Sequence, residues 1–258
     1  MTPLRHWPMP RGFLLASLLA LAGLGCTFGV SEKTRDLTAT GPESGWTVLT
    51  FKATAIGSTL RVTGTDAGVP TANATVAILT AGPGTSGPSG QALESASLSF
   101  GEPTPEGAET ALPLTLSVSS SVEELPRVVD LTLSVPRARG VSVDVSDTPV
   151  SVSGLDGPLS VSTSNAGVTG DVGGGSVTTS NGRVDLGWTA ASGLEVRTTN
   201  AEVLVGVPAD AGVSFELSTT NGAVLLFGQR YAAPYTGLLN GGGQRLRVTT
   251  SNGDIVIR

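Results

Sequence analysis

Val177-Thr-Thr-Ser-Asn-Gly-Arg-Val184 is one copy of an eight-residue phrase that occurs six times between Val143 and Ile255. The other copies are Val143-Asp-Val-Ser-Asp-Thr-Pro-Val150, Val161-Ser-Thr-Ser-Asn-Ala-Gly-Val168, Val196-Arg-Thr-Thr-Asn-Ala-Glu-Val203, Leu217-Ser-Thr-Thr-Asn-Gly-Ala-Val224 and Val248-Thr-Thr-Ser-Asn-Gly-Asp-Ile255. Their fifth residues are Asp147, Asn165, Asn181, Asn200, Asn221 and Asn252, at spacings of 18, 16, 19, 21 and 31. Repeats of this length, built from Val, Thr and Ser, predict an all-β, single-stranded β-helix or β-solenoid.

The composition of the phrase predicts how each coil is built. Alternating Val and Thr favour a strand with one buried face, and Asn-Gly or Asn-Ala supplies a residue that tolerates positive φ at a corner. Stacked coils place like residues over like at about 4.8 Å. We therefore expect the six fifth-position residues to form a structural hydrogen-bonded ladder, and Arg183 to lie beside Glu202 as an exposed pair. A right-handed coil is expected.

Residues 1–25 have the pattern of a secretory signal peptide. Arg5 and Arg11 precede an apolar run, Phe13 to Leu24, that is too short to span a membrane. Cys26 follows at once and is the single cysteine. The segment resembles the lipobox of bacterial lipoproteins, in which this cysteine is acylated, although Gly23 stands where that box usually has Leu. Cleavage after Ala22, which would leave Cys26 as a free thiol, is the alternative.

Removal of the signal changes the charge balance. It takes away the single histidine, two of the 15 basic residues and none of the 21 acidic ones, which leaves a net charge of −8. That acidity argues against binding to nucleic acid and against adhesion to anionic lipid through charge. The expected membrane contact is therefore the lipid on Cys26. The signal peptide and the lipid on Cys26 together predict a protein exported to the bacterial cell envelope. In a Gram-negative cell the outer membrane is expected, because Thr27 is not the Asp that signals inner-membrane retention.

The remaining chain divides into a tether and one domain. Residues 26–45 have no apolar period and are interpreted as a flexible tether, and residues 46–258 as the solenoid domain, with clear repeats over 143–257. Between 46 and 129 short strand-like segments alternate with Gly- and Pro-rich turns. These segments are either irregular early coils, the interpretation we favour, or a β cap on the solenoid end.

Two segments carry a family resemblance. Leu133-Ser-Val-Pro136 precedes the repeats, and Val205-Gly-Val-Pro208-Ala-Asp-Ala-Gly-Val213 leads into Thr-Thr-Asn-Gly. This pattern resembles the bacterial putative adhesin family of the DUF4097 type, clearly over about 130–258. The resemblance implies a β-helix of the cell envelope that acts as an adhesin or binding scaffold. It implies no catalytic residues.

The residue types of the mature chain limit the catalytic sites that it could form. Without histidine or a second cysteine the mature chain has no Ser-His-Asp or Cys-His arrangement and no structural zinc site, and no cofactor or metal is predicted. Gly170-Asp-Val-Gly-Gly-Gly-Ser176 does not have the order of a calcium-binding repeat. The alternative to a non-catalytic scaffold is a carbohydrate-active enzyme, which should show two carboxylates about 5 to 10 Å apart in a cleft beside an aromatic side chain. The expected partner of a scaffold is a protein, a polysaccharide or a second copy.

One change of pattern predicts an apolar face. The middle residue of the second strand is Ser151, Thr169 and Asp185 in early repeats but Leu204, Leu225 and Val256 in later ones. Outward-facing apolar residues stacked in a row are rarely left in contact with water. We expect the excursion from Phe227 to Gln244, which carries Tyr231, Tyr235, Leu238 and Leu239, to fold over this row, or the row to be an interface.

Overall fold

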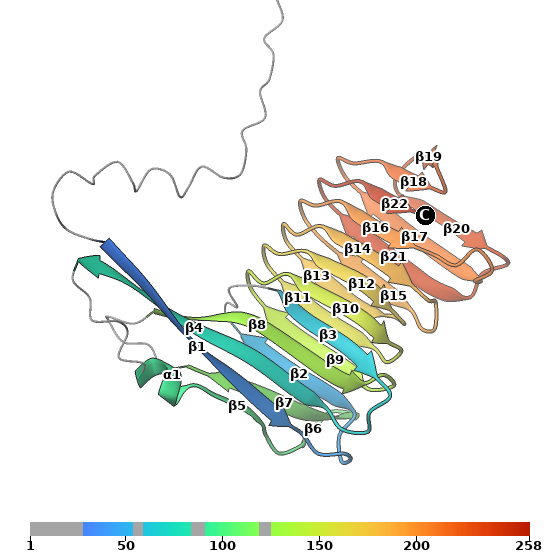
Figure 1. Ribbon diagram of the computed structural model, residues 1–258. Coiled ribbons are helices and arrows are strands. Elements are labelled where there is room, and N and C mark those ends of the chain that lie inside the picture. Colours follow the sequence, from blue (N-terminus) through green and yellow to red (C-terminus); the bar gives the residue numbers. More distant parts are fainter. Residues whose placement is uncertain (1–27, 54–58, 84–90, 119–124) are drawn as a thin grey trace, which may run out of the picture.

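The computed structural model describes residues 28–53, 59–83, 91–118 and 125–258 as two eleven-stranded β-sheets packed on one core (Figure 1). One short helix, α1 (Gln91–Ser95), is the helix of the described ranges. The expected all-β class is confirmed. The predicted signal peptide and Cys26 lie outside the described residues.

Sheet A and sheet B are named here by their strands. Sheet A has, in spatial order, β1 (Phe28–Thr40), β4 (Thr71–Pro83), β8 (Leu125–Pro136), β3 (Leu60–Thr65), β10 (Val150–Leu155), β12 (Val168–Val172), β14 (Val184–Trp188), β16 (Val203–Gly206), β22 (Ile255–Ile257), β18 (Val224–Leu226) and β19 (Gln229–Tyr231). Sheet B has β20 (Tyr235–Leu239), β17 (Val213–Thr219), β21 (Gln244–Thr250), β15 (Leu194–Arg197), β13 (Gly175–Thr179), β11 (Leu159–Thr163), β9 (Gly140–Val145), β2 (Val48–Ala53), β7 (Glu109–Ser117) and β5 (Ser97–Phe100), with β6 (Thr104–Glu106) also paired to β7.

From β9 to β18 the chain passes alternately between the sheets. Odd-numbered strands enter sheet B and even-numbered strands enter sheet A, so each pair forms one layer whose neighbours run parallel to it. Alternate residues point inward, because side chains alternate between the two faces of a strand. Val161, Val177 and Val196 stack in register and are almost fully buried. The core is therefore a column of aliphatic side chains between the sheets.

The last layers are stacked in an order that differs from the order of the chain. β21 lies between β15 and β17, and β22 lies between β16 and β18. The layer that ends the chain is thus inserted between two earlier ones. The repeat spacing does not indicate this insertion, because each repeat fits any of its neighbours equally well.

The early region shows the same kind of insertion. β2 lies between β7 and β9, and β3 lies between β8 and β10, in both cases as parallel partners. Residues 46–129 therefore contribute a parallel layer to the stack. They also contribute β4, β5 and β6, which pair antiparallel at this end together with β1.

The expectation of a flexible tether over 26–45 is wrong for residues 28–40, whereas residues 41–45 lie outside the strands. Phe28–Thr40 forms β1, which pairs with β4 along 13 residues. From Glu32 to Thr40 only Leu37 is buried. The segment lacks an apolar period because it is an edge strand that satisfies the backbone of β4 while most of its side chains face solvent.

Each end of the core is closed differently. Leu93 of α1 and the neighbouring Ala96 are buried at the end formed by β1 and β5.

At the other end the excursion after β18 forms β19 and β20, which pair antiparallel with β18 and β17. The expectation that this excursion folds over the row of Leu204, Leu225 and Val256 is therefore wrong. The excursion extends both sheets instead, because the last layer would otherwise leave its backbone unpaired.

Candidate functional site

The six fifth-position residues lie in one column on an exposed corner. Each Asn donates a hydrogen bond from its Nδ2 to the Oδ1 of the next residue in the column. The donor–acceptor pairs are Asn165 to Asp147 (2.6 Å), Asn181 to Asn165 (2.8 Å), Asn200 to Asn181 (2.7 Å), Asn252 to Asn200 (2.6 Å) and Asn221 to Asn252 (2.7 Å). Asn252 precedes Asn221 in this column, as the inserted last layer requires.

A second, buried column supports the same corner. The threonines two residues before the ladder are buried at Thr163, Thr179, Thr198, Thr219 and Thr250. Thr219 shows their role, because its hydroxyl donates to the Gly253 carbonyl and accepts from the Gly222 amide. Burial of a hydroxyl is tolerated when it is hydrogen-bonded. Our sequence interpretation missed this column, although a Thr stands two places before the Asn in each of these five repeats.

The expected reason for glycine at the corner needs correction. The ladder asparagines and Gly182, Gly222 and Gly253 are not among the residues with positive φ. An added Cβ at Gly182 would lie 1.8 Å from the Ala166 carbonyl oxygen, and one at Gly253 would lie 1.9 Å from that of Ala201. Glycine is required there because the backbone of the neighbouring layer comes too close for a side chain.

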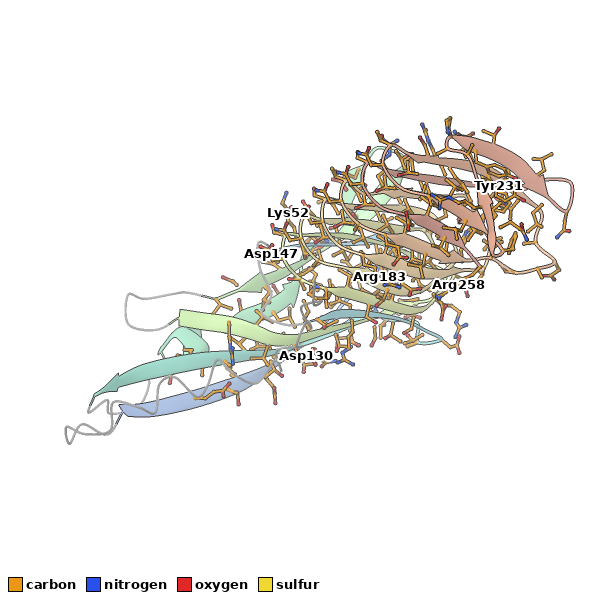
Figure 2. The ribbon with its side chains drawn as sticks, turned by 90° about the horizontal axis from the view of Figure 1, so that it is seen from above. Lys52, Asp130, Asp147, Arg183, Tyr231 and Arg258 are labelled. Carbon is orange, nitrogen blue, oxygen red and sulfur yellow. The ribbon has the colours of Figure 1, made fainter. Side chains whose placement is uncertain are left out.

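The expected exposed pair on adjacent strands is confirmed. Arg183 Nη1 lies 3.0 Å from Glu202 Oε2, and both side chains are well exposed. Arg183 also forms an ion pair with Asp185 at 3.8 Å, and Asp185 accepts a hydrogen bond from Arg258 at 2.5 Å. Arg183 and Arg258, both labelled in Figure 2, thus contact the same carboxylate. Such exposed pairs contribute little to stability.

Leu204, Val256 and Leu225 are direct neighbours in sheet A, in that order. Leu204 is buried, whereas the other two are half-buried. Arg258 follows β22 and reaches Asp185 on β14, so its aliphatic stem must cross β16, where Leu204 faces outward. The arginine therefore covers one end of the row, and Val256 and Leu225 remain partly accessible.

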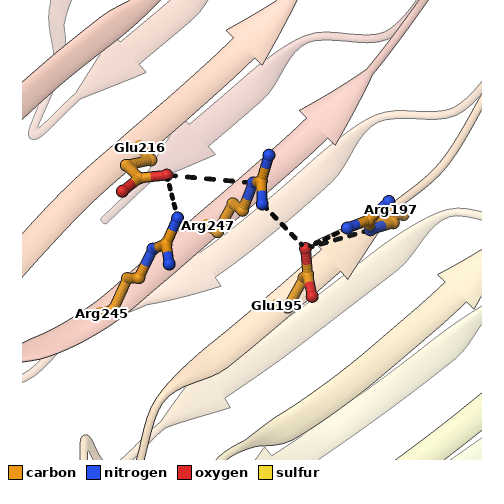
Figure 3. A network of polar contacts seen from close by, with 5 residues as sticks. All are labelled: Glu195, Arg197, Glu216, Arg245 and Arg247. Atoms are coloured by element: carbon orange, nitrogen blue, oxygen red, sulfur yellow. Dashed lines mark hydrogen bonds and ion pairs between the residues drawn. The ribbon is translucent and has the colours of Figure 1, made fainter.

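The outer face of sheet B carries a network of charges at the later layers (Figure 3). Arg247 lies between Glu195 (3.7 Å) and Glu216 (3.9 Å) on neighbouring strands. Arg197 contacts Glu195 at 2.6 Å, and Arg245 contacts Glu216 at 2.5 Å. The hydrogen bond from Arg245 lowers the pKa of Glu216 below its ordinary value. In the earlier layers the same column is uncharged, with Ser142, Ser160 and Ser176.

A shallow hollow lies beside this network. Its lining residues are Gly175, Gly193, Leu194, Glu195, Arg245 and Arg247. The lining holds a single carboxylate and no aromatic side chain. Trp46 and Trp188 are buried in the core. This hollow thus differs from the carboxylate pair with an aromatic platform that a glycoside-cleaving site would need. A second hollow, over β2, β7 and β9, is lined by two carboxylates, Glu106 and Asp144, but its aromatic residue, Phe51, is buried.

The end formed by β19 and β20 gathers exposed apolar side chains. Phe227, Tyr231 and Leu238 are the exposed large hydrophobic residues of the described chain, at 47%, 40% and 68% exposure. The Tyr231 ring packs against the Tyr235 ring in a tilted arrangement, with ring centroids 4.7 Å apart and an interplanar angle of 53°. These tyrosines pair with the inward-facing Val224 and Leu217, so they cover the end of the core.

Across 28–53, 59–83, 91–118 and 125–258, no three His, Cys, Asp or Glu side chains gather closely enough to hold a metal ion. Over those ranges the structure also holds no helix of the length and apolarity that a membrane crossing requires.

Comparisons with known proteins found structural likeness but no sequence relative. Neither a family model nor a curated protein matches the sequence. A putative cell adhesion protein from Clostridium sporogenes ATCC 15579 is similar at 13% identity and a TM-score of 0.45, over 89% of this chain and 99% of that one. A putative adhesin from Bacteroides fragilis NCTC 9343 (11%, TM-score 0.29, 88% and 96% covered) and a putative lipid binding protein from Parabacteroides distasonis ATCC 8503 (9%, TM-score 0.30, 88% and 96%) are also similar. Likeness at this level carries no argument about function.

Proposed function

We propose that this chain is a non-catalytic adhesin or binding scaffold of the bacterial cell envelope, a β-solenoid held to the membrane by a lipid on Cys26. The observation that carries the proposal is the difference between the two ends of the molecule. The outermost strand at one end is β1, whose first residue follows Cys26 by only two positions. β19 and β20 form the opposite end of the stack (Figure 1). That end carries the exposed large apolar side chains of the described residues.

This arrangement suits a protein that is attached at one end and binds at the other. Two residues span at most about 7 Å, so a lipid on Cys26 would hold the start of β1 close to the membrane surface. The stack then carries the opposite end outward. In sheet B, β20 lies eight strand spacings from β7, a distance of roughly 38 Å at about 4.8 Å for each spacing.

The scaffold interpretation is supported by the regularity of the exposed faces. The Asn ladder and the Ser column repeat from layer to layer, and regular stacks of this kind use extended surfaces for binding. The partner class is a protein, a polysaccharide or a second copy. The outer membrane of a Gram-negative cell is the proposed site, since Thr27 lacks the inner-membrane signal.

A carbohydrate-active enzyme is the second candidate, and one observation bears on it. Glu195 and Glu216 lie two strands apart in sheet B, at roughly 10 Å, which approaches the separation in inverting glycosidases. A general acid needs a raised pKa, whereas the pKa of Glu216 is lowered by Arg245. Within such a pair Glu216 could therefore act as the general base but not as the general acid.

The proposal is tested by labelling and binding experiments on the whole protein. Labelling of cells with radioactive fatty acid should mark the wild type, and Cys26→Ala should lose the label and appear in the soluble fraction, because stable anchoring requires acyl chains. A wild type that is exported and unlabelled would contradict the anchor.

The soluble Cys26→Ala protein, fixed through its N-terminal end, should bind envelope glycans on an array or whole cells. The chain should not be shortened to residue 46, because that would remove β1. Failure to bind either would contradict the adhesin. Cleavage of a polysaccharide panel that is lost in Glu195→Gln or Glu216→Gln would favour the enzyme instead.

A further inference from the structure

The two ends of the stack differ in how their outer strands are protected. β1, the outermost strand of sheet A at one end, exposes Glu32, Lys33, Arg35 and Asp36. β20, the outermost strand of sheet B at the other end, reads Tyr-Thr-Gly-Leu-Leu and carries no charge. Charged side chains on edge strands prevent pairing with other chains. β1 has that protection and β20 does not, although β5, the outer strand of sheet B at the β1 end, is also uncharged.

β20 is paired on one side only and is shaped to accept another strand. It is antiparallel to β17, and no described strand pairs with its other edge. Thr236 and Leu238 are exposed, while Tyr235 and Leu239 pack against the core. Gly237 has no side chain, and a Cβ there would lie 2.3 Å from the Tyr235 hydroxyl. The tyrosine ring thus extends along the strand over Gly237.

The same end is the apolar end of the molecule. Leu238 is 68% exposed and Tyr231 is 40% exposed. Phe227 is 47% exposed and has a φ of 47°, in a two-residue turn with Gly228 at 80°. Both values are typical of a type I′ turn, which favours Asn-Gly. A large aromatic residue at positive φ is unfavourable, so local structure does not account for the presence of phenylalanine at this site.

We propose that the β20 end binds a second copy of this chain, by antiparallel pairing of β20 with the β20 of that copy. A two-fold axis perpendicular to sheet B makes this contact self-complementary, so no second surface is needed. With the axis at Gly237, Thr236 of each copy lies opposite Leu238 of the other, and sheet B becomes continuous. β19 carries Arg230. If β19 paired in the same way, the Arg230 charges of the two copies would repel each other, so the pairing is assigned to β20 alone.

The β20–β20 contact rests on the proposed function, and it specifies that the partner of the adhesin is a second copy of the same chain. If Cys26 holds the opposite end at a membrane, two β20 ends meet head to head when the copies stand on facing cells. The protein is then a homophilic adhesin. A contact built on a five-residue strand and a few apolar side chains is small, and small contacts are transient. Many copies on one surface raise the overall strength without any new contact.

The test uses beads that carry the soluble Cys26→Ala protein, attached through its N-terminal end. Beads with this protein should aggregate. Beads with added Thr236→Lys and Leu238→Lys should stay dispersed, because the lysines of two copies would face each other across the axis. The matched control adds Ser160→Lys and Thr178→Lys, which are exposed on the same sheet in earlier layers. This control should aggregate like its parent.

Charge reversal makes the test specific for copy-to-copy pairing. Beads with Thr236→Glu and Leu238→Glu should also disperse alone, and a mixture with the lysine beads should aggregate again. Thermal unfolding and circular dichroism show whether each variant is folded.

Three results would overturn the proposal. They are parent beads that stay dispersed, lysine beads that aggregate as the parent does, and a mixture of lysine and glutamate beads that fails to aggregate although both proteins are folded. If the parent beads stay dispersed but bind envelope glycans or cells, the homophilic contact is wrong and the adhesin proposal stands. If the beads aggregate but the exported wild type takes up no fatty-acid label, the anchor is wrong and the contact stands.

Discussion

Gly253→Ala should destabilise the protein, although it adds only one methyl group. Gly253 belongs to the inserted layer, and a Cβ there would lie 1.9 Å from the carbonyl oxygen of Ala201 and 2.4 Å from its carbon. Both contacts are with backbone, so the layers must move apart. Overpacking of this kind costs about 1–3 kcal/mol. At about 2–4 °C for each kcal/mol in a chain of this size, Tm should fall by roughly 2–12 °C.

The matched control is Gly206→Ala, on β16 of sheet A. A Cβ at Gly206 has its nearest neighbour at 3.7 Å, and this glycine has no positive φ. The control should be neutral or slightly stabilising, because alanine restricts the unfolded chain. Circular dichroism during heating measures both variants. A Tm for Gly253→Ala within 1 °C of the wild type, or an equal loss in Gly206→Ala, would refute the close approach of the layers.

Three further results are expected. Asn200→Ala removes two ladder hydrogen bonds and should lower the free energy of unfolding by about 1–2 kcal/mol in urea, whereas Asn221→Ala at the ladder end, which donates one, should cost about half as much; equal costs would contradict the ladder. In a Cys26→Ala background, Arg197→Cys with Thr249→Cys should form a disulfide, because these residues are paired on neighbouring strands. Arg197→Cys with Ser218→Cys should not form one, because β21 separates the two strands. The reverse result would show that the layers follow chain order. The pKa of Glu216, measured by NMR, should lie below its ordinary value and rise toward it in Arg245→Gln. A lowered pKa gives stability that is present above the unfolded-state pKa and is lost as the pH falls through the folded-state pKa. The wild type should therefore keep this contribution to a lower pH than the variant.

The sequence predicts the repeating part of this fold well, because each layer is specified by local residues. Val-Thr alternation determines which side chains face inward, and Asn at one position determines the corner. Those two signals also predict the neighbours Arg183 and Glu202. The buried Thr column could have been found from the same repeats, had the hydrogen-bonding needs of the corner been considered.

The order of the layers and the ends of the stack could not be predicted in this way. Asn252 bonds equally well to Asn200 or Asn221, so the repeats do not determine which layer lies beside which. β1 has few apolar residues because it is an edge strand, and it therefore resembles a linker. The excursion after Leu226 is rich in apolar residues, which suggests that it packs over a sheet face. It pairs with the edges of both sheets instead, because the backbone of the last layer would otherwise lack hydrogen bonds.

The cover of the apolar row depends on a contact between distant residues. Arg258 reaches Asp185 across β16, and no pattern in the sequence links these two positions. The exposed end at β20 is equally hidden in the sequence, because the tyrosines and leucines of the excursion divide between the core end and solvent only once both sheets are formed.

The central claim is that the β1 end is held at the membrane while the β20 end stands away from it. Energy transfer from a single dye to a lipid-phase acceptor tests this in the wild-type, acylated protein. Thr34→Cys lies in β1, eight residues after Cys26, and Thr236→Cys lies in β20; both sites are exposed. We expect strong transfer from the dye at residue 34 and weak transfer from residue 236. Equal transfer from both sites, or stronger transfer from residue 236, would contradict the account.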